Sequence, residues 1–453
     1  MMNLKSIVSK LRNKHFLSLV GNGSMSVLSM VTVGILLRFM PKDDVGYWFF
    51  FQSVFVLLDT FRTGFLQVAM IKFYTGAEKI KADAVLGSVW FLSLMITSIL
   101  IVINLLSIFF LPYIQNVGIV SVIEWFGITF LFTLPSAIAS WILQSDQRFD
   151  KLLLLRIINQ GAFILMVLLI IIFKNLNLNL ILIINALSST LVSVYCIAQG
   201  WTRLSTFGKR TKEAIWELFH FGKYSVGTTI STNLLRSSDT FIIMFVLGAA
   251  GPAAVAMYTI PMRLMEIIEI PLRAFLSTGM PSMSEAFNKG NRNEVVAIMQ
   301  KYAGTLTLAL FPVSMAAILL ADVAITVLGG SQYAGTNAVS VYRIFMCFAM
   351  FFPIDRFLGV TLDIIHQPRI NFYKVLVMLV TNITFDFIGI HLFGNINGVA
   401  VATLFTFLSG VFFGYFYLKK YLNFTLFGFF TVGLGEIKSM INQFFLKTKT
   451  ARL

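Results

Sequence analysis

Long apolar runs, separated by short polar segments, occupy almost the whole chain. A helix needs about 20 residues to cross the hydrocarbon core of a bilayer, and we count twelve runs of that length. The pattern therefore predicts twelve membrane-spanning helices. The first six cover residues 16–40, 45–70, 86–111, 118–143, 152–173 and 179–200, and the second six cover 220–248, 252–281, 303–328, 338–362, 374–393 and 396–418.

The composition agrees with this pattern. Of 453 residues, 57% are hydrophobic and 12% are charged, which is too much apolar side chain for one soluble core. We therefore expect an all-α polytopic membrane protein. Four basic residues precede the first run and no small-residue cleavage site follows it, so this run should remain as an anchor.

The lysines and arginines outside the apolar runs predict the orientation. Placing the N-terminus in the cytoplasm puts twenty-six of them on the cytoplasmic side, Lys374 among them, and leaves only Lys42 and Lys174 outside. The positive-inside rule requires this asymmetry, so both termini should lie on the cytoplasmic side of the cell inner membrane. The net charge of +15 then reflects topology and contact with anionic membrane lipids, and it does not indicate nucleic-acid binding.

The chain also shows a weak internal repeat. The segments MPKDDVGYWFFFQSVFVLLDTFRTGF and LGAAGPAAVAMYTIPMRLMEIIEIPLRAF share a layout, and a shift of 210 residues places Asp59 on Glu269 and Arg62 one place short of Arg273. An even number of spans per half predicts two parallel six-helix repeats around a central cavity. The expected parts are an N-terminal half (1–200), a cytoplasmic linker (201–219), a C-terminal half (220–420) and a basic cytoplasmic or interfacial tail (421–453).

Several arginines lie within or at the ends of the predicted spans. An arginine at the centre of a span costs about 2.5–3.5 kcal/mol on insertion scales, so such residues are expected to face a water-filled or ligand-filled cavity. Arg38 and Arg343 lie near the outer ends of their spans, where snorkelling to the interface explains them. The others favour an anionic cargo; they are Arg62, Arg236, Arg263, Arg273 and Arg356.

The span 252–281 carries the densest group of charges. Arg263, Glu266, Glu269 and Arg273 are three, three and four residues apart, which places them on one face of a helix. They either line a cavity or neutralise one another as ion pairs that fix the packing. Shorter pairs at three-residue spacing join Asp59 to Arg62 and Arg236 to Asp239. The four acids, Asp59, Asp239, Glu266 and Glu269, are candidates for coupling to H+ or Na+ or for balancing the arginines.

Several kinds of chemistry have no support in the sequence. No phosphate-binding loop ending in Gly-Lys-Ser or Gly-Lys-Thr is present, so we expect no ATP hydrolysis. The four histidines are scattered near span ends and the two cysteines are single, so neither a metal site nor a disulfide framework can be drawn. We therefore expect no cofactor, no metal and no catalytic residues, and a protein that is not an enzyme.

The start of the second span, GYWFFFQS, with Asp59 and Gly64 after it, and the basic segment before FHFGKYSVGTTISTNLLRSSDTFI resemble the polysaccharide-transport branch of the multidrug/oligosaccharidyl-lipid/polysaccharide exporter superfamily. Within it, the chain looks like Wzx-type flippases of lipid-linked O-antigen or capsule repeat units. The resemblance implies a V-shaped bundle and a polyprenyl-pyrophosphate-linked glycan as cargo, with other glycan-assembly membrane proteins as partners. It also implies that arginines in the lumen bind the pyrophosphate; the matching positions are Arg62, Arg236, Arg263 and Arg273.

Two alternatives remain open. A cation-coupled multidrug antiporter of the same superfamily would need a coupling carboxylate, for which Asp239 is available. Such a protein carries cationic drugs, which do not explain buried arginines. A membrane glycan polymerase or transferase is disfavoured because no predicted outer loop exceeds about a dozen residues, the scale of ordinary connections rather than of a domain.

Overall fold

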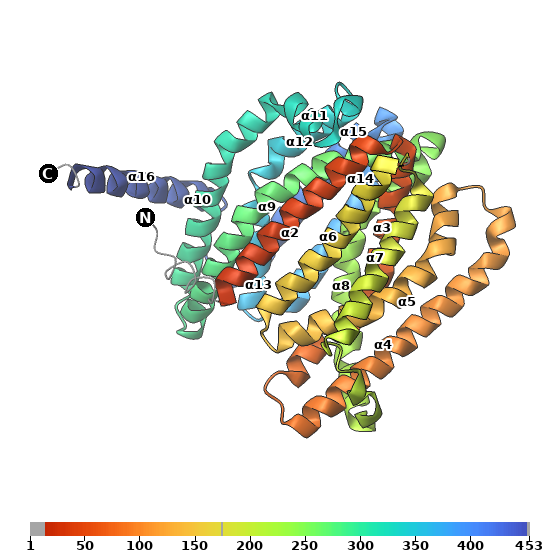
Figure 1. Ribbon diagram of the computed structural model, residues 1–453. Helices are drawn as coiled ribbons and strands as arrows, with labels where there is room; N and C mark the ends of the chain where they lie inside the picture. Colours follow the sequence, from red (N-terminus) through yellow and green to blue (C-terminus); the bar gives the residue numbers. More distant parts are fainter. Residues whose placement is uncertain (1–13, 174, 451–453) are drawn as a thin grey trace. The chain divides into compact units, whose positions relative to one another are not determined.

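The structure is a computed structural model of the protein and describes residues 14–173 and 175–450. All regular elements in these ranges are helices, so the expected all-α fold is confirmed (Figure 1). Lys5, Lys10, Arg12 and Lys174, which contributed to the orientation argument, lie outside the described residues.

The described residues of the first predicted half form six long helices. Asparagine side chains cap two of them: Asn116 Oδ1 accepts the N–H of Ile119, and Asn177 Oδ1 accepts that of Leu180. Such caps satisfy N–H groups that have no partner within the helix. The helices are α2 (Lys14–Phe39), α3 (Lys42–Tyr74), α4 (Lys79–Ser107, continued by the 3-10 helix η1, Ile108–Tyr113), α5 (Val117–Ser145), α6 (Phe149–Phe173) and α7 (Leu178–Ala198).

In the rest of the chain, the described residues form nine further α-helices. They are α8 (Lys212–Val246), α9 (Gly251–Asn288), α10 (Arg292–Leu319), α11 (Ala321–Gly329), α12 (Asn337–Ala349), α13 (Phe352–Ile364), α14 (Pro368–Phe393), α15 (Ile396–Leu418) and α16 (Phe427–Thr450). Short 3-10 helices also occur, among them η2 (Leu204–Lys209).

Within the described residues, eight helices are long and apolar enough to cross a membrane, or nine if α12 and α13 form one broken span. Helices α8 and α9 are not in this set, and Met25–Phe39 of α2 is a shorter apolar helix among the residues searched. A polytopic membrane protein is therefore confirmed. The count of twelve spans stays a prediction.

The expected span 338–362 differs from the structure because it is divided into α12 and α13, which meet at 54°. Pro353 stands in the first turn of α13, where its missing N–H costs nothing, whereas inside a continuous helix it would remove a hydrogen bond. The proline therefore favours a new helix start at this place. The expected span 303–328 is likewise divided, into α10 and α11.

The chain forms two compact units. The first ends at Met244 and also includes Ala250–Ala256, and the second comprises Phe245–Ala249 and the chain from Met257 onward. Helix α8 thus belongs almost entirely to the first unit. The two six-helix halves expected at 1–200 and 220–420 stay a prediction.

In the first unit, α3, α4 and α7 each pack against α5, and the segment between α7 and α8 packs on α4. Trp90 Nε1 donates a hydrogen bond of 2.9 Å to the carbonyl of Thr202. A Cβ on Gly87 would lie 2.4 Å from the carbonyl oxygen of Thr206, so only glycine permits this approach. The first part of the expected linker (201–219) is therefore packed against α4.

In the second unit, α14 packs along α15, and α16 packs against α10. Gln300 Nε2 donates to the carbonyl of Thr425 at 3.1 Å, and Lys301 Nζ lies 2.9 Å from Glu436 Oε2. The tail that we expect to be interfacial thus contains a helix whose first half contacts α10.

Candidate functional site

Arg62 is the most deeply buried arginine among the described residues, with 1% of its side chain exposed. It lies on α3, where Asp59 stands one turn earlier. Its NH2 lies 2.6 Å from Asp59 Oδ1, and its Nε donates to the same oxygen at 2.9 Å. The pair foreseen from the three-residue spacing is therefore formed.

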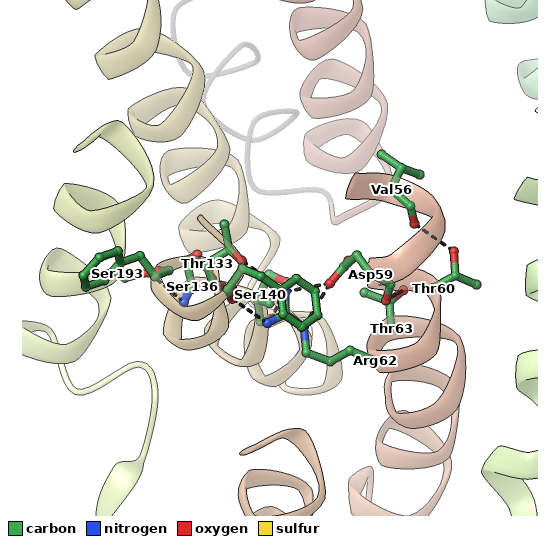
Figure 2. Close-up of polar contacts among 12 residues, drawn as sticks. Val56, Asp59, Thr60, Arg62, Thr63, Thr133, Ser136, Ser140 and Ser193 are labelled. Atoms are coloured by element: carbon green, nitrogen blue, oxygen red, sulfur yellow. Dashed lines mark hydrogen bonds and ion pairs between the residues drawn. The ribbon is translucent and has the colours of Figure 1, made fainter. Parts of the chain in front are cut away.

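The same guanidinium also reaches across to α5, as Figure 2 shows. NH1 donates to the carbonyl of Phe130 at 3.1 Å, and NH2 donates to Thr133 Oγ1 at 3.2 Å. The guanidinium carbon lies 4.1 Å from the centre of the Phe130 ring. All three nitrogens of Arg62 therefore have protein partners, and these partners offset the cost of burying the charge.

Helix α5 contains Pro135 just after the turn that Arg62 contacts. Proline has no N–H for the carbonyl of Leu131, and its ring crowds that carbonyl. On α7, Ser193 Oγ donates to the carbonyl of Phe132 and accepts the N–H of Ser136 at 3.3 Å. Residues 132 and 136 are the two that an α-helix pairs across one turn. A neighbouring side chain thus supplements the backbone ladder of α5 at this turn.

Arg236 and Asp239 lie on α8 in different surroundings. The side chain of Arg236 is exposed, whereas Asp239 is buried. On the same helix, Asn233 Nδ2 donates to Thr60 Oγ1 of α3 at 2.6 Å. Polar side chains therefore join α8 to the helix that carries Arg62.

On α9, the four charges form two ion pairs. Arg263 NH1 lies 2.6 Å from Glu266 Oε1, and Arg273 NH2 lies 2.6 Å from Glu269 Oε2. Both arginines stay accessible, with 32% and 59% of their side chains exposed. The two ion pairs agree with the interpretation that these charges neutralise one another. Because both arginines are exposed, the interpretation that this face lines a cavity stays open.

Arg356 on α13 joins the second of these pairs, since its NH2 lies 3.9 Å from Glu269 Oε1. Glu269 therefore lies between two arginines from different helices. Sequence spacing could not show this approach, because residues 269 and 356 are far apart in the chain.

A second buried ion pair was missed by the sequence analysis. Lys374 Nζ lies 2.5 Å from Asp355 Oδ1 and also donates to the carbonyl of Asp355 at 3.1 Å. We counted Lys374 among the cytoplasmic lysines, but α14 begins at Pro368 and Lys374 is buried within it. The available signal was Asp355, an acid inside a predicted span.

Among the described residues, no group of three or more His, Cys, Asp or Glu side chains could hold a metal ion. Cys196 is buried and Cys347 is exposed, and both are free.

Helices of membrane-spanning length and apolarity, with ion pairs set among them, define an integral membrane protein. The family model described as "Polysaccharide biosynthesis protein" matches residues 11–287, and the MatE model matches residues 229–388. The family model of polysaccharide biosynthesis proteins covers more than half of the chain, so the chain belongs to this family. No curated protein matches.

Solved structures share the fold at low sequence identity. An inward-facing multidrug resistance MATE family transporter of the MOP superfamily has a TM-score of 0.74 and 15% identity, covering 86% of this chain and 93% of that chain. The lipid II flippase MurJ in an inward closed conformation has a TM-score of 0.72 and 15% identity, covering 94% and 92%. A MOP superfamily transporter from Pyrococcus furiosus has a TM-score of 0.61 and 15% identity, covering 95% and 98%.

Proposed function

We propose that the protein is a flippase that moves an undecaprenyl-pyrophosphate-linked oligosaccharide repeat unit from the cytoplasmic to the outer leaflet of the cell inner membrane. The match of residues 11–287 to the polysaccharide biosynthesis family carries this proposal. Similarity to a lipid II flippase adds a solved structure of the same fold. In this proposal twelve spans form two parallel six-helix repeats around a central cavity, and both termini are cytoplasmic.

The chemistry of the cargo explains why a protein is needed. A polyprenyl tail can remain in lipid, but a sugar headgroup with a pyrophosphate would lose its hydrogen bonds in hydrocarbon, at several kcal/mol for each unsatisfied group. The protein has only to supply a polar path for the headgroup. Alternating access, in which the path opens first to the cytoplasm and then outward, would provide it.

Arginine suits the headgroup because its planar guanidinium binds phosphate oxygens in a bidentate manner and stays charged. Arg236, Arg263 and Arg273 have accessible side chains, so they are ready for such contacts. Arg62 is a binding residue of a different kind, since its donors are already engaged inside the protein. The acids Asp59, Asp239, Glu266 and Glu269 would hold these arginines in place or carry a coupling H+ or Na+.

The membrane potential can drive this transport. An inside-negative potential contributes about 2.3 kcal/mol per charge per 100 mV, so moving about two negative charges outward gains about 4–5 kcal/mol. No nucleotide is then required.

A cation-coupled multidrug antiporter is the second candidate. The MatE match over residues 229–388 and the similarity to a multidrug resistance transporter favour it. Its coupling carboxylate would be Asp239, which is buried on α8.

A deletion strain tests the proposal. We expect completed lipid-linked repeat units to accumulate at the cytoplasmic leaflet, and drug sensitivity to stay unchanged. The variant Arg236→Ala/Arg263→Ala should fail to restore turnover. Arg343→Ala is the matched control, because Arg343 pairs with Asp322 on an exposed surface. Normal turnover in the double variant would remove the role of these arginines, and drug sensitivity alone would favour the antiporter.

A further inference from the structure

The buried position of Arg62 poses a chemical problem for the proposed function. A pyrophosphate needs free N–H donors, but the three nitrogens of Arg62 are bound to Asp59, Phe130 and Thr133. Two of these three partners lie on one turn of α5. Bidentate binding of the cargo, with two adjacent N–H groups, therefore requires the guanidinium to leave this turn.

That turn depends on help from outside its own helix. Pro135 withholds an N–H from the carbonyl of Leu131, and Ser193 of α7 contacts the carbonyl of Phe132 and the N–H of Ser136 on the next positions. Arg62 supplies two further hydrogen bonds to Phe130 and Thr133. Inside a membrane the loss of such bonds is costly, because no water is present to replace them. Sharp kinks arise at proline and where a side chain enters the backbone ladder, and both occur here.

We propose that Arg62 is a switch between the proline turn of α5 and the anionic headgroup of the cargo. When the guanidinium binds a pyrophosphate, the Phe130–Thr133 turn loses its donors from α3, and the part of α5 before Pro135 moves relative to α7. Cargo binding is thereby linked to a change in shape of the first unit. Ser193 is a positioning residue that favours the cargo-free shape. The inference rests on the proposed function for the identity of the anion.

A distance measurement tests the movement itself. Spin labels at Val117 on α5 and Ile183 on α7 occupy exposed positions, in a background with Cys196→Ala and Cys347→Ala. A 20° change at Pro135 would displace Val117, about 27 Å away along the helix, by about 9 Å. Undecaprenyl pyrophosphate should shift the distance distribution of the otherwise unchanged protein by several ångströms. Inorganic pyrophosphate distinguishes the headgroup alone from the lipid, and a shift of the same kind with it assigns the effect to the anion.

Substitutions separate the switch from simple binding. Arg62→Ala should show the shifted distance in the absence of undecaprenyl pyrophosphate, and adding this lipid should cause no further shift. Thr133→Val and Ser193→Ala each remove the two hydrogen bonds of one hydroxyl group and should shift part of the population if Arg62→Ala fails to fold. Ser193→Thr keeps the hydroxyl and should restore the original distribution. Pro135→Ala supplies the missing N–H and should cancel the effect of Ser193→Ala, which a merely structural role for Ser193 would not predict.

The inference is overturned if Thr133→Val and Ser193→Ala leave the spin-label distances unchanged. It is also overturned if undecaprenyl pyrophosphate shifts the distance in Arg62→Ala as much as in the parent protein. These outcomes are distinct from failure of the proposed function. If undecaprenyl pyrophosphate does not bind at all, the cargo assignment is wrong. The distances measured in the variants without added ligand still decide whether Arg62 and Ser193 control the shape of α5.

Discussion

Lys374 Nζ and Asp355 Oδ1 lie 2.5 Å apart, with 5% and 10% of the two side chains exposed, so α14 is joined to the start of α13 by a buried ion pair. Asp355 stands in the first turn of α13, where the positive end of the helix dipole also stabilises its charge. The pair therefore fixes the position at which the broken span 338–362 resumes.

Removing one partner of this pair should be far more damaging than removing both. Lys374→Met leaves an uncompensated buried carboxylate, which costs about 3–5 kcal/mol, whereas replacing both partners by apolar residues is often nearly neutral. We expect Lys374→Met to lower the thermal midpoint in detergent strongly, and Lys374→Met/Asp355→Leu to restore most of the loss. Equal losses in the single and double variants would show that the pair does not act as a unit.

The acids on α9 should weaken anion binding at the neighbouring arginines. Glu266 Oε1 lies 2.6 Å from Arg263, and both side chains are about one-third exposed, so a water-like dielectric applies. Two unit charges about 4 Å apart in water interact by about 1 kcal/mol, or about fivefold in affinity, and the repulsion between Glu266 and an anion bound at Arg263 should be of this size. Glu266→Gln should therefore tighten binding of undecaprenyl pyrophosphate about fivefold in a titration.

Glu285→Gln is the matched control for this titration. Glu285, in the last turn of α9, pairs at 2.6 Å with Lys289 just after the helix, on an exposed surface beyond the predicted span. Its neutralisation should therefore leave the affinity unchanged. Weaker binding in Glu266→Gln would mean that the acid orients Arg263 rather than cancelling its charge.

How far the sequence predicts this molecule depends on the range of each interaction. The apolar runs predicted the bounds of α5, α7 and α15 to within a few residues, because the residues of each segment determine where its helix forms. The pairing of Asp59 with Arg62 was also local, since the two residues are one turn apart. These features follow from spacing along a single helix.

The contacts of Arg62 with Phe130 and Thr133 could not be predicted in this way. They join two helices whose register is set by packing, and neither Thr133 nor Ser193 carries a charge that would attract notice in an apolar run. The burial of Lys374 was missed for a related reason. A span boundary drawn at the first lysine assumes that lysine faces water, and a buried partner such as Asp355 reverses that assumption.

The segment between α7 and α8 should depend on Arg203 for its attachment to the first unit. Arg203 NH2 lies 2.6 Å from Asp146 Oδ2, and its NH1 donates to the hydroxyl of Tyr74. We expect Arg203→Ala to accelerate tryptic cleavage after Lys209 or Arg210 in limited proteolysis, because the segment would separate from α4 more often. Arg148→Ala, which removes an exposed pair with Asp150, should leave the rate unchanged. An unchanged rate in Arg203→Ala would show that the contacts of Trp90 suffice.

The contact of α16 with α10 should be controlled by the absence of a side chain at Gly304. A Cβ at this position would lie 1.9 Å from the carbonyl oxygen of Phe429, closer than any real contact, so α16 would have to move. Gly304→Ala should lower the thermal midpoint, since overpacking costs about 1–3 kcal/mol, and should expose α16 to protease.

Gly435→Ala is the same chemical change on α16 itself, where a Cβ would meet nothing within 4 Å. It should be neutral or stabilising by about 0.5–1 kcal/mol, because alanine favours a helix over glycine. The same Gly→Ala change should thus destabilise the protein at position 304 and be neutral or stabilising at position 435. The difference between the two changes in thermal midpoint measures the packing of α16 on α10. If both behave alike in thermal unfolding and proteolysis, α16 does not rest on α10 in the membrane-extracted protein.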